Sequence, residues 1–208
     1  MTQAFDDKAT TWDDDPMRVS RAAEVASQIL EVIAPSRDMH LLDFGSGTGL
    51  LGFALLPYVA RVTFADPSEG MLARVVAKLR ERGETTGSVY RLDASALTLP
   101  ERYDAIVSLM TLHHVPDTAA VVRLLAERLR PGGWLALCDL DLEDGSFHDH
   151  PSDEVHHGFD RAELVALTEQ AGLEQSRVST AFTIQKERGD AVREYPLFLL
   201  TARRLQDA

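Results

Sequence analysis

The sequence predicts an α/β fold in which a mainly parallel sheet of seven strands is covered by helices on both faces. Apolar residues recur alternately at the two-residue period of a strand and the 3.6-residue period of a helix. Gly45, Gly47 and Gly49 follow the first expected strand, and residues 134–140 form a continuous apolar strand of the kind that is buried on both faces. Strands separated by helices require right-handed crossovers, so the predicted class is doubly wound.

The first half of the chain alternates strand and helix in order. Asp15 and Pro16 form a cap and first-turn signal for an amphipathic helix that is expected to end near Pro35. A strand at 39–44 precedes the glycine cluster, and a helix at 50–56 is stopped by Pro57. The same alternation predicts a strand at 61–65, a helix at 71–82 ended by Gly83, and strands at 89–92 and 103–109.

The second half adds two helices and three strands. A helix over 121–129 is broken by Pro131-Gly132-Gly133, and the strand at 134–140 follows. Asp160 with Glu163 predicts a capping box for a helix that runs to Gly172. Strands at 178–184 and 195–201 are expected to form a final antiparallel pair around Gly189, which brings the count to seven.

Composition limits the function classes. The 208 residues, 45% of them hydrophobic, are enough for one domain with a sizeable core. The net charge of −12 repels phosphate backbones, so nucleic acid is a poor partner.

No apolar run approaches the ~18 residues of a membrane span, and residues 1–16 carry five aspartates rather than a targeting signal. Cys138 is the single cysteine, so no internal disulfide can form and we do not expect sulfur redox chemistry. We expect a cytoplasmic protein.

Polar or flexible residues follow four of the expected parallel strands, where ligands bind in doubly wound sheets. Asp43 lies just before the alternating glycines, whose loop and following helix N-terminus suit a nucleotide or a nucleotide-like cofactor. Asp66 comes 23 residues after Asp43, about the interval that places a carboxylate on a ribose diol. Asp93 follows the third strand, and the histidine pair 113–114 follows the fourth.

The glycine loop alone leaves the cofactor open, because Gly47, Gly49 and Gly52 also satisfy the G-x-G-x-x-G spacing of dinucleotide sites. The whole set of Asp43, the glycines, Asp66, Asp93, the histidine pair and the Pro-Gly-Gly turn resembles class I S-adenosylmethionine-dependent methyltransferases. Within that family the chain is most similar to the small-molecule branch that includes quinone-biosynthesis C-methyltransferases. The resemblance covers nearly the whole chain.

The resemblance implies a Rossmann-like sheet with a final antiparallel hairpin and an N-terminal helical lid that contains Phe5, Trp12 and Asp13. It implies one domain divided into a lid and helix (1–35), a cofactor-binding core (36–140) and an acceptor side (141–208). It also implies S-adenosyl-L-methionine as cofactor, with S-adenosyl-L-homocysteine as product. The residues that would hold this cofactor are Asp43, Gly45, Ser46, Gly47, Gly49, Asp66, Pro67, Ser68, Met71, Asp93, Ala94 and Leu109.

Catalysis would consist mainly of aligning a small-molecule acceptor with an already activated methyl group. A base is needed only for a protonated acceptor atom, and histidine has a suitable pKa. The candidates are His113, His114 and His148, although the first two equally suit a structural role beside the cofactor.

The segment 139–160 holds eight acidic residues and four histidines without a lysine or arginine. We interpret it as a solvated loop or an acceptor-binding segment in which Asp141, Phe147 and His148 face the substrate. We do not expect an obligatory metal, because the spacing of these side chains is loose for a metal site. A nicotinamide-dependent oxidoreductase using the same loop and a non-catalytic metabolite- or metal-binding protein remain alternatives. The oligomeric state, monomer or homodimer, stays open.

Overall fold

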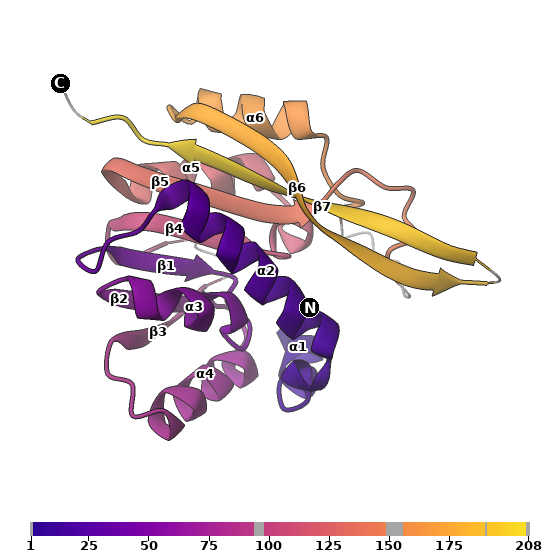
Figure 1. Ribbon diagram of the computed structural model, residues 1–208, viewed down its shortest axis with the longest axis horizontal. Helices are drawn as coiled ribbons and strands as arrows, with labels where there is room; N and C mark the ends of the chain where they lie inside the picture. Colours follow the sequence, from indigo (N-terminus) through magenta and orange to yellow (C-terminus); the bar gives the residue numbers. More distant parts are fainter. Residues whose placement is uncertain (1, 94–97, 149–155, 190, 207–208) are drawn as a thin grey trace.

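One seven-stranded sheet with the order β3-β2-β1-β4-β5-β7-β6 organises the computed structural model, which describes residues 2–93, 98–148, 156–189 and 191–206 (Figure 1). Strands β1 to β5 are mutually parallel where they pair, and β7 is antiparallel to both β5 and β6. The predicted doubly wound sheet with a final antiparallel hairpin is thus confirmed. The strands are β1 (His40–Phe44), β2 (Arg61–Asp66), β3 (Gly87–Arg91), β4 (Tyr103–Leu109), β5 (Leu129–Leu140), β6 (Glu174–Arg188) and β7 (Ala191–Arg203).

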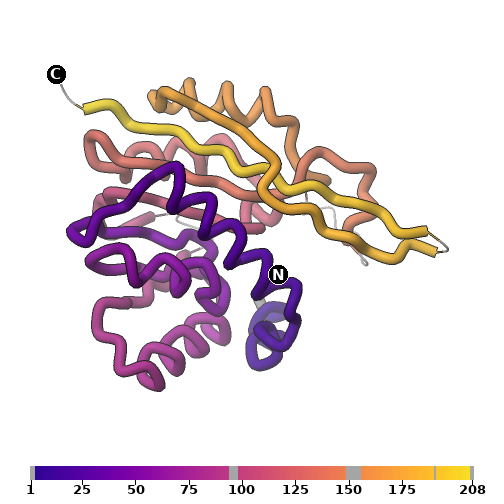
Figure 2. The backbone as a smooth tube through the Cα atoms, viewed as in Figure 1, coloured from indigo at the N-terminus to yellow at the C-terminus, as the bar shows by residue number. Residues whose placement is uncertain are grey.

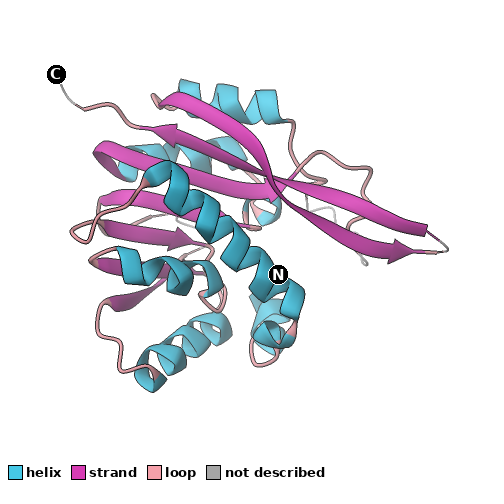
Figure 3. Ribbon diagram, viewed as in Figure 1, coloured by secondary structure: helices cyan, strands magenta, loops and turns pink. Residues whose placement is uncertain are grey.

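Helices cover both faces of the sheet (Figure 3). On one face α2 (Pro16–Ile33), α3 (Leu50–Leu55) and α4 (Glu69–Glu81) share an apolar core with the sheet, and on the other α5 (Thr118–Arg128) and α6 (Arg161–Gln170) share a second. The remaining helical turns are α1 (Thr2–Lys8), η1 (Trp12–Asp14), η2 (Leu56–Tyr58) and η3 (Leu112–His114). None of the helices in the described ranges has the length and apolar character needed to cross a membrane.

The starts of α2 and α6 follow the capping chemistry expected from the sequence, and the start of α4 is capped in the same way. The side chain of Asp15 accepts a hydrogen bond from the Met17 N–H, and Pro16 occupies the first helical position of α2. Ser68 caps α4 by accepting from the Met71 N–H, and Asp160 caps α6 by accepting from two backbone N–H groups. These caps fix where α2, α4 and α6 leave the preceding segments.

The two longest strands exceed the predicted lengths. β6 and β7 extend as a two-stranded arm beyond the end of β5, and most side chains of the arm are exposed (Figure 1). An exposed arm has no continuous apolar face, so its polar residues do not give the alternation that marks a half-buried strand. β5 also begins at Leu129 rather than 134, because Gly132 adopts φ +80° and donates to the Arg204 carbonyl, keeping the Pro-Gly-Gly turn within the strand.

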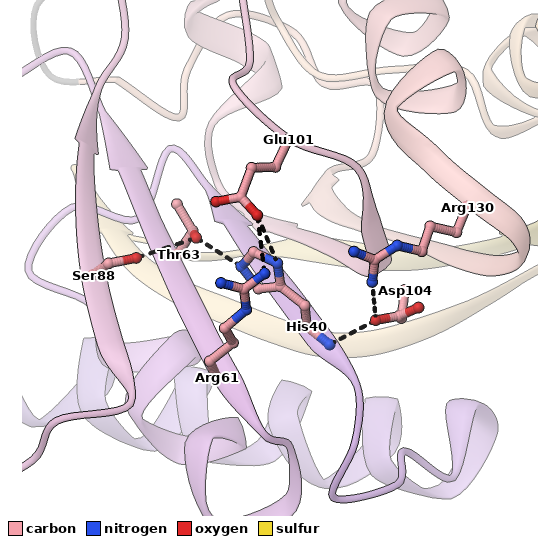
Figure 4. A network of polar contacts seen from close by, with 7 residues as sticks. All are labelled: His40, Arg61, Thr63, Ser88, Glu101, Asp104 and Arg130. Carbon is pink, nitrogen blue, oxygen red and sulfur yellow. Dashed lines mark hydrogen bonds and ion pairs between the residues drawn. The ribbon is translucent and has the colours of Figure 1, made fainter.

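A network of polar side chains closes the amino-terminal end of β1, opposite the glycine loop (Figure 4). His40 is 3% exposed; its Nε2 lies 2.8 Å from Thr63 Oγ1 and its backbone N–H donates to Asp104 at 2.7 Å. Arg61 and Glu101 form an ion pair beside its ring. Burial, together with the nearby charge of Arg61, lowers the pKa of His40 to about 4.

His40 is therefore expected to contribute to acid unfolding. Its folded-state pKa lies below that of the unfolded chain, so the unfolded state binds a proton first and stability falls as the pH drops from ~6.5 to ~4. When the pH is lowered from 7 to 4.5, the free energy of unfolding should fall by about 2–3 kcal/mol less in His40→Gln than in the wild type. Urea unfolding at both pH values measures this difference. The exposed His157→Gln is the control, and an equal acid loss in both variants contradicts the assignment.

Candidate functional site

A cavity of about 270 Å³ lies where β1, β2 and β4 end. Side chains from the loops after these strands form its floor, and residues of α1, η1 and α2 cover it. The residues that line it are Phe5, Trp12, Arg18, Arg21, Ala22, Asp43, Phe44, Gly45, Ser46, Gly47, Thr48, Leu50, Leu51, Asp66, Pro67, Met71, Leu92, Leu109, Met110, Thr111, His114, Val115 and Pro116. The cavity thus occupies the position expected for a ligand in a doubly wound sheet.

The glycine-rich loop forms one wall. Gly45 and Ser46 donate backbone hydrogen bonds to the Ala65 carbonyl at 2.8 and 3.0 Å, which ties the loop to the end of β2. Gly45 has φ +69°, and a Cβ there would lie 2.1 Å from the side chain of Thr111, so no larger residue fits. The hydroxyl of Ser46 is buried without a hydrogen-bond partner. A polar ligand beside the loop would supply the missing partner.

Two buried carboxylates lie side by side at the ends of β1 and β2. Asp66 accepts from the Gly47 and Ser68 N–H groups at 2.8 Å each, and Asp43 accepts from the Gly52 N–H at 2.9 Å. Burial raises the pKa of both, and that of Asp43 to about 7. Each Asp66 oxygen keeps a free lone pair, so the carboxylate can still accept from two hydroxyl groups of a ligand.

The other predicted cofactor residues are distributed unevenly. Pro67, Met71 and Leu109 line the cavity, whereas Gly49 and Ser68 stand behind it as the N-caps of α3 and α4. Asp93 is exposed just after β3 and does not line the cavity. Ala94 lies outside the described residues. The glycine-loop side of the site is therefore well assembled, whereas Asp93 lies outside the cavity lining.

Met110 and Thr111 are cavity residues that the sequence analysis missed. Met110 has φ +55°, a left-handed conformation that is uncommon for a residue other than glycine, and its N–H donates to the Cys138 carbonyl at 2.8 Å. The Thr111 hydroxyl donates to the Gly45 carbonyl at 3.1 Å. This turn after β4 therefore locks onto the glycine loop. Only the position of the turn at a strand end, and no residue pattern, could have suggested it.

The amino-terminal segment closes the cavity and is held by two aspartates. Asp6 accepts from the Ser68 hydroxyl at 2.5 Å and the Gly70 N–H at 2.8 Å, so α1 lies against the first turn of α4 (Figure 2). Asp13 accepts from the Thr48 hydroxyl at 2.5 Å and pairs with Lys78, whose Nζ also donates to the Thr48 carbonyl at 2.7 Å. Phe5 and Trp12, at 5.9 Å between ring centroids, form the inner surface of this cover.

Removal of the contacts that Asp13 makes with Thr48 and Lys78 should loosen the cover. Asp13→Ala leaves Lys78 and the Thr48 hydroxyl without their acceptor, and we expect S-adenosylhomocysteine to bind roughly three- to tenfold more weakly, since partly exposed charged pairs contribute about 1 kcal/mol. Proteolysis of the first 15 residues should be faster as well. The control is Asp14→Ala, which removes the same charge from an exposed neighbour. Equal affinities and cleavage rates in the two variants would show that the contact at Asp13 does not hold the cover.

The three candidate histidines form one cluster at the ends of β4 and β5. The ring of His114 lies 4.0 Å from that of His113 and 5.7 Å from that of His148. His113 Nδ1 lies 2.6 Å from Asp139, a fully buried carboxylate. Because a carboxylate only accepts, Nδ1 donates the hydrogen bond to Asp139. Of the three rings, only His114 lines the cavity.

Burial keeps two of these rings neutral. It lowers the pKa of His114 to about 3 and that of His148 to about 4, in each case reinforced by the neighbouring His113. His114 Nδ1 and His148 Nε2 are both buried without a hydrogen-bond partner. The cluster therefore presents hydrogen-bonding atoms that have no protein partner, close to the apolar ring of Phe5, which lies 5.3 Å from that of His114.

The arm formed by β6 and β7 positions the segment that carries His148. Arg188 donates to the carbonyls of Ser146 and Phe147, and Lys186 Nζ lies 4.1 Å from the centre of the Phe147 ring. The Phe147 ring in turn lies 5.0 Å from that of His148. The long hairpin thus fixes one wall of the histidine cluster.

Metal ligands do not assemble within the described ranges. No group of three or more histidine, cysteine, aspartate or glutamate side chains there could hold a metal ion. Asp149, His150, Asp153 and Glu154 of the acidic and histidine-rich segment lie outside those ranges. Asp141 makes a two-bonded ion pair with Arg161 instead.

Fold and site together define a class of protein. Residues 42–135 match the family model described as a methyltransferase domain, and this stretch belongs to that family. The resemblance to class I S-adenosylmethionine-dependent methyltransferases is thereby confirmed.

Individual relatives agree with this class. The ubiquinone biosynthesis O-methyltransferase of Leptothrix cholodnii is 32% identical over 52% of this chain and 47% of its own. An uncharacterised methyltransferase of Schizosaccharomyces pombe is 30% identical over 67% of this chain and 55% of its own. The chain spans about half the length of the curated relatives it matches. A SAM-dependent methyltransferase structure from Aquifex aeolicus superposes with a TM-score of 0.69 at 23% identity, covering 96% and 98% of the two chains, which shows the same fold.

Proposed function

We propose that this chain transfers a methyl group from S-adenosylmethionine to a small-molecule acceptor. The main support is a single observation: the buried Asp66 carboxylate faces a covered cavity beside a glycine loop that carries an unpartnered serine hydroxyl. These groups fit a ribose diol and the polar end of the cofactor. The relatives named ubiquinone biosynthesis O-methyltransferase favour an oxygen acceptor over the carbon acceptor of the branch suggested by the sequence.

The cofactor would supply a methyl carbon activated by an adjacent sulfonium charge. The chain has to align the acceptor with that carbon and exclude water, which the cover formed by Phe5 and Trp12 is placed to do. His114, neutral and lining the cavity, would accept a hydrogen bond from the protonated acceptor atom. The Asp139 carboxylate behind the cluster would favour the positive charge that develops on His114 when the proton leaves that atom.

Calorimetric titration tests the proposed cofactor. The protein should bind S-adenosylhomocysteine in the micromolar range and show no binding of NADH at the same ionic strength. Binding of NADH alone would favour the nicotinamide-dependent alternative. A larger stabilisation by divalent metals than by S-adenosylhomocysteine would favour a non-catalytic binding protein. The comparisons support neither alternative. The cytoplasmic location and the choice between monomer and homodimer stay predictions.

His148 is proposed as an acceptor-side residue. With an acceptor found by screening, His148→Ala is expected to lower turnover several-fold and to leave the affinity for S-adenosylhomocysteine unchanged, because the ring adjoins the histidine cluster and not the glycine loop. His157→Ala serves as the control, since that histidine is exposed. Wild-type kinetics in His148→Ala would remove this histidine from the site.

A further inference from the structure

The arm that β6 and β7 form has two different faces. β7 runs on past its last pairing with β5, at Leu197, so the arm consists of residues 183–188 and 191–196 (Figure 1). Side chains directly opposite each other in an antiparallel pair lie on the same face, as do alternate residues of one strand. The register places on one face, the inner face, Ile184, Lys186, Arg188, Ala191, Arg193 and Tyr195. The residues of the outer face, at 183, 185, 187, 192, 194 and 196, are all exposed.

The inner face lies against residues 144–148, the segment that carries His148. Arg188 donates to the Ser146 carbonyl at 2.8 Å and to the Phe147 carbonyl at 2.6 Å. Lys186 Nζ donates to the same Phe147 carbonyl at 2.8 Å. Two consecutive carbonyls are therefore held by charged donors, which fixes the direction in which the chain enters residue 148.

The Phe147 ring connects the arm to the histidine cluster. It is 6% exposed, and Lys186 Nζ lies 4.1 Å from its centre. The ring of Tyr195, on the arm, lies 5.2 Å from that of Phe147, and the ring of His148 lies 5.0 Å from it. His148 lies in turn 5.3 Å from the ring of His113. A continuous series of contacts thus runs from the arm to the cluster.

The charges of the arm are sorted between its faces. All charged side chains of the inner face are cations, Lys186, Arg188 and Arg193, whereas those of the outer face are Glu187 and Glu194. Cations suit a face whose targets are carbonyl oxygens. A hairpin that stands beyond its sheet is marginally stable in water, so the arm and residues 144–148 stabilise each other. None of the arm residues is among those that line the cavity.

We propose that the arm shapes the acceptor end of the site, with Arg188 as the residue that positions His148 against the histidine cluster. This inference rests on the proposed function, in which His148 is an acceptor-side residue, and adds the element that holds this residue in place. Loss of Arg188 frees both carbonyls and lets the ring of His148 move into water. The glycine-loop side, which the arm does not touch, keeps its geometry.

The protonation of His148 tests the proposal without any acceptor. Burial, reinforced by the charges of His113 and Lys186, lowers the pKa of His148 to about 4. In NMR spectra of the ring Cε1–H, the wild-type ring should therefore stay neutral from pH 7 to about pH 5. The other charged or titratable groups that act on the ring are Asp139 and His157, and both remain in every variant.

Three variants of β6 arginines are compared in this titration. In Arg188→Ala the ring should become hydrated and take up a proton between pH 7 and about pH 5, because its pKa returns toward about 6.5. Arg188→Lys can still donate to one carbonyl and should keep part of the wild-type behaviour. Arg177→Ala is the control, because this exposed arginine lies near the other end of β6, outside the arm, and should titrate like the wild type.

Kinetics with an acceptor found by screening show whether Arg188 acts through His148. Arg188→Ala should lower turnover several-fold, as His148→Ala does, and should leave the affinity for S-adenosylhomocysteine unchanged. The double variant should be no slower than His148→Ala alone, because a positioning residue has no further effect once the side chain that it positions is gone.

Two results would overturn the proposal. A wild-type titration of His148 in Arg188→Ala would show that the arm does not hold this ring. Losses that multiply in the double variant would show that Arg188 does not act through His148. Failure of the wild type to bind S-adenosylhomocysteine, measured in a separate titration, would instead refute the proposed function. Melting temperatures of the variants show that they are folded.

Discussion

Asp66→Ala is expected to weaken S-adenosylhomocysteine binding by about 10- to 150-fold. A hydrogen bond to a charged acceptor contributes about 1.5–3 kcal/mol, and each 1.4 kcal/mol corresponds to a tenfold change in affinity. Asp66 is 8% exposed at the cavity wall and is already oriented by the N–H groups of Gly47 and Ser68. A ribose diol would meet a carboxylate that needs no reorganisation. Removal of that carboxylate also leaves the Gly47 N–H of the loop without its acceptor.

Calorimetry on the wild type and the variant measures this loss directly. Asp66→Asn separates charge from shape, because the amide keeps one accepting oxygen but turns an N–H₂ group toward the backbone donors of Gly47 or Ser68. It should bind as weakly as the alanine variant. Asp14→Ala, on the exposed surface, should bind like the wild type. Unchanged affinity in a folded Asp66→Ala variant would exclude the ribose role.

The glycine-loop side of the site was predictable because its residues are close in sequence to strand ends. Asp43, Gly45 and Gly47 lie within five consecutive positions, and Asp66 ends the next strand. Parallel strands bring such ends together without any long-range information, so the motif predicts both position and chemistry. Asp66 stays available to a ligand, since Ser68 provides the cap of α4.

The rest of the site was less predictable, for physical reasons. Arg21 lies on α2 at the spacing of a solvated helix face, and only the packing of α2 against α3 and the sheet places it at the cavity. Met110 adopts its left-handed conformation because its N–H is held by the Cys138 carbonyl of the neighbouring strand, a contact that no local pattern encodes. Asp139 belongs to the acidic segment interpreted from the sequence as a solvated or acceptor-binding loop, yet it is buried and accepts from His113.

Asp139→Ala is expected to lower the free energy of unfolding by about 3–5 kcal/mol, the usual cost of breaking a buried pair and leaving its partner behind. The carboxylate is fully buried and accepts three hydrogen bonds, from His113 Nδ1 at 2.6 Å, the Leu140 N–H at 2.8 Å and the His113 N–H at 3.3 Å. Alanine at this position would leave all three donors without an acceptor in a cavity too small to rehydrate them fully.

The pH dependence of this contribution has a definite sign. Burial raises the pKa of Asp139, but the charge and hydrogen bonds of His113 and the backbone N–H groups outweigh it, so that the pKa is lowered below 3.8. A carboxylate with a lowered folded-state pKa stabilises the protein above its unfolded pKa and loses this effect as the pH falls through its folded pKa. The wild type and Asp139→Ala should therefore differ fully at pH 7 and progressively less below pH 4.

Urea unfolding at pH 7 compares Asp139→Ala with a matched control two residues further along the chain. Asp141 pairs with Arg161 at 2.6 Å, but both side chains are partly exposed, so Asp141→Ala should cost about 1 kcal/mol or less. A similar loss in both variants would mean that burial of the His113–Asp139 pair adds nothing to stability. Asp139→Asn adds a test of mechanism: it keeps an acceptor for Nδ1 but not the charge, so a stable variant with low turnover would show that the charge itself supports proton transfer at the cluster.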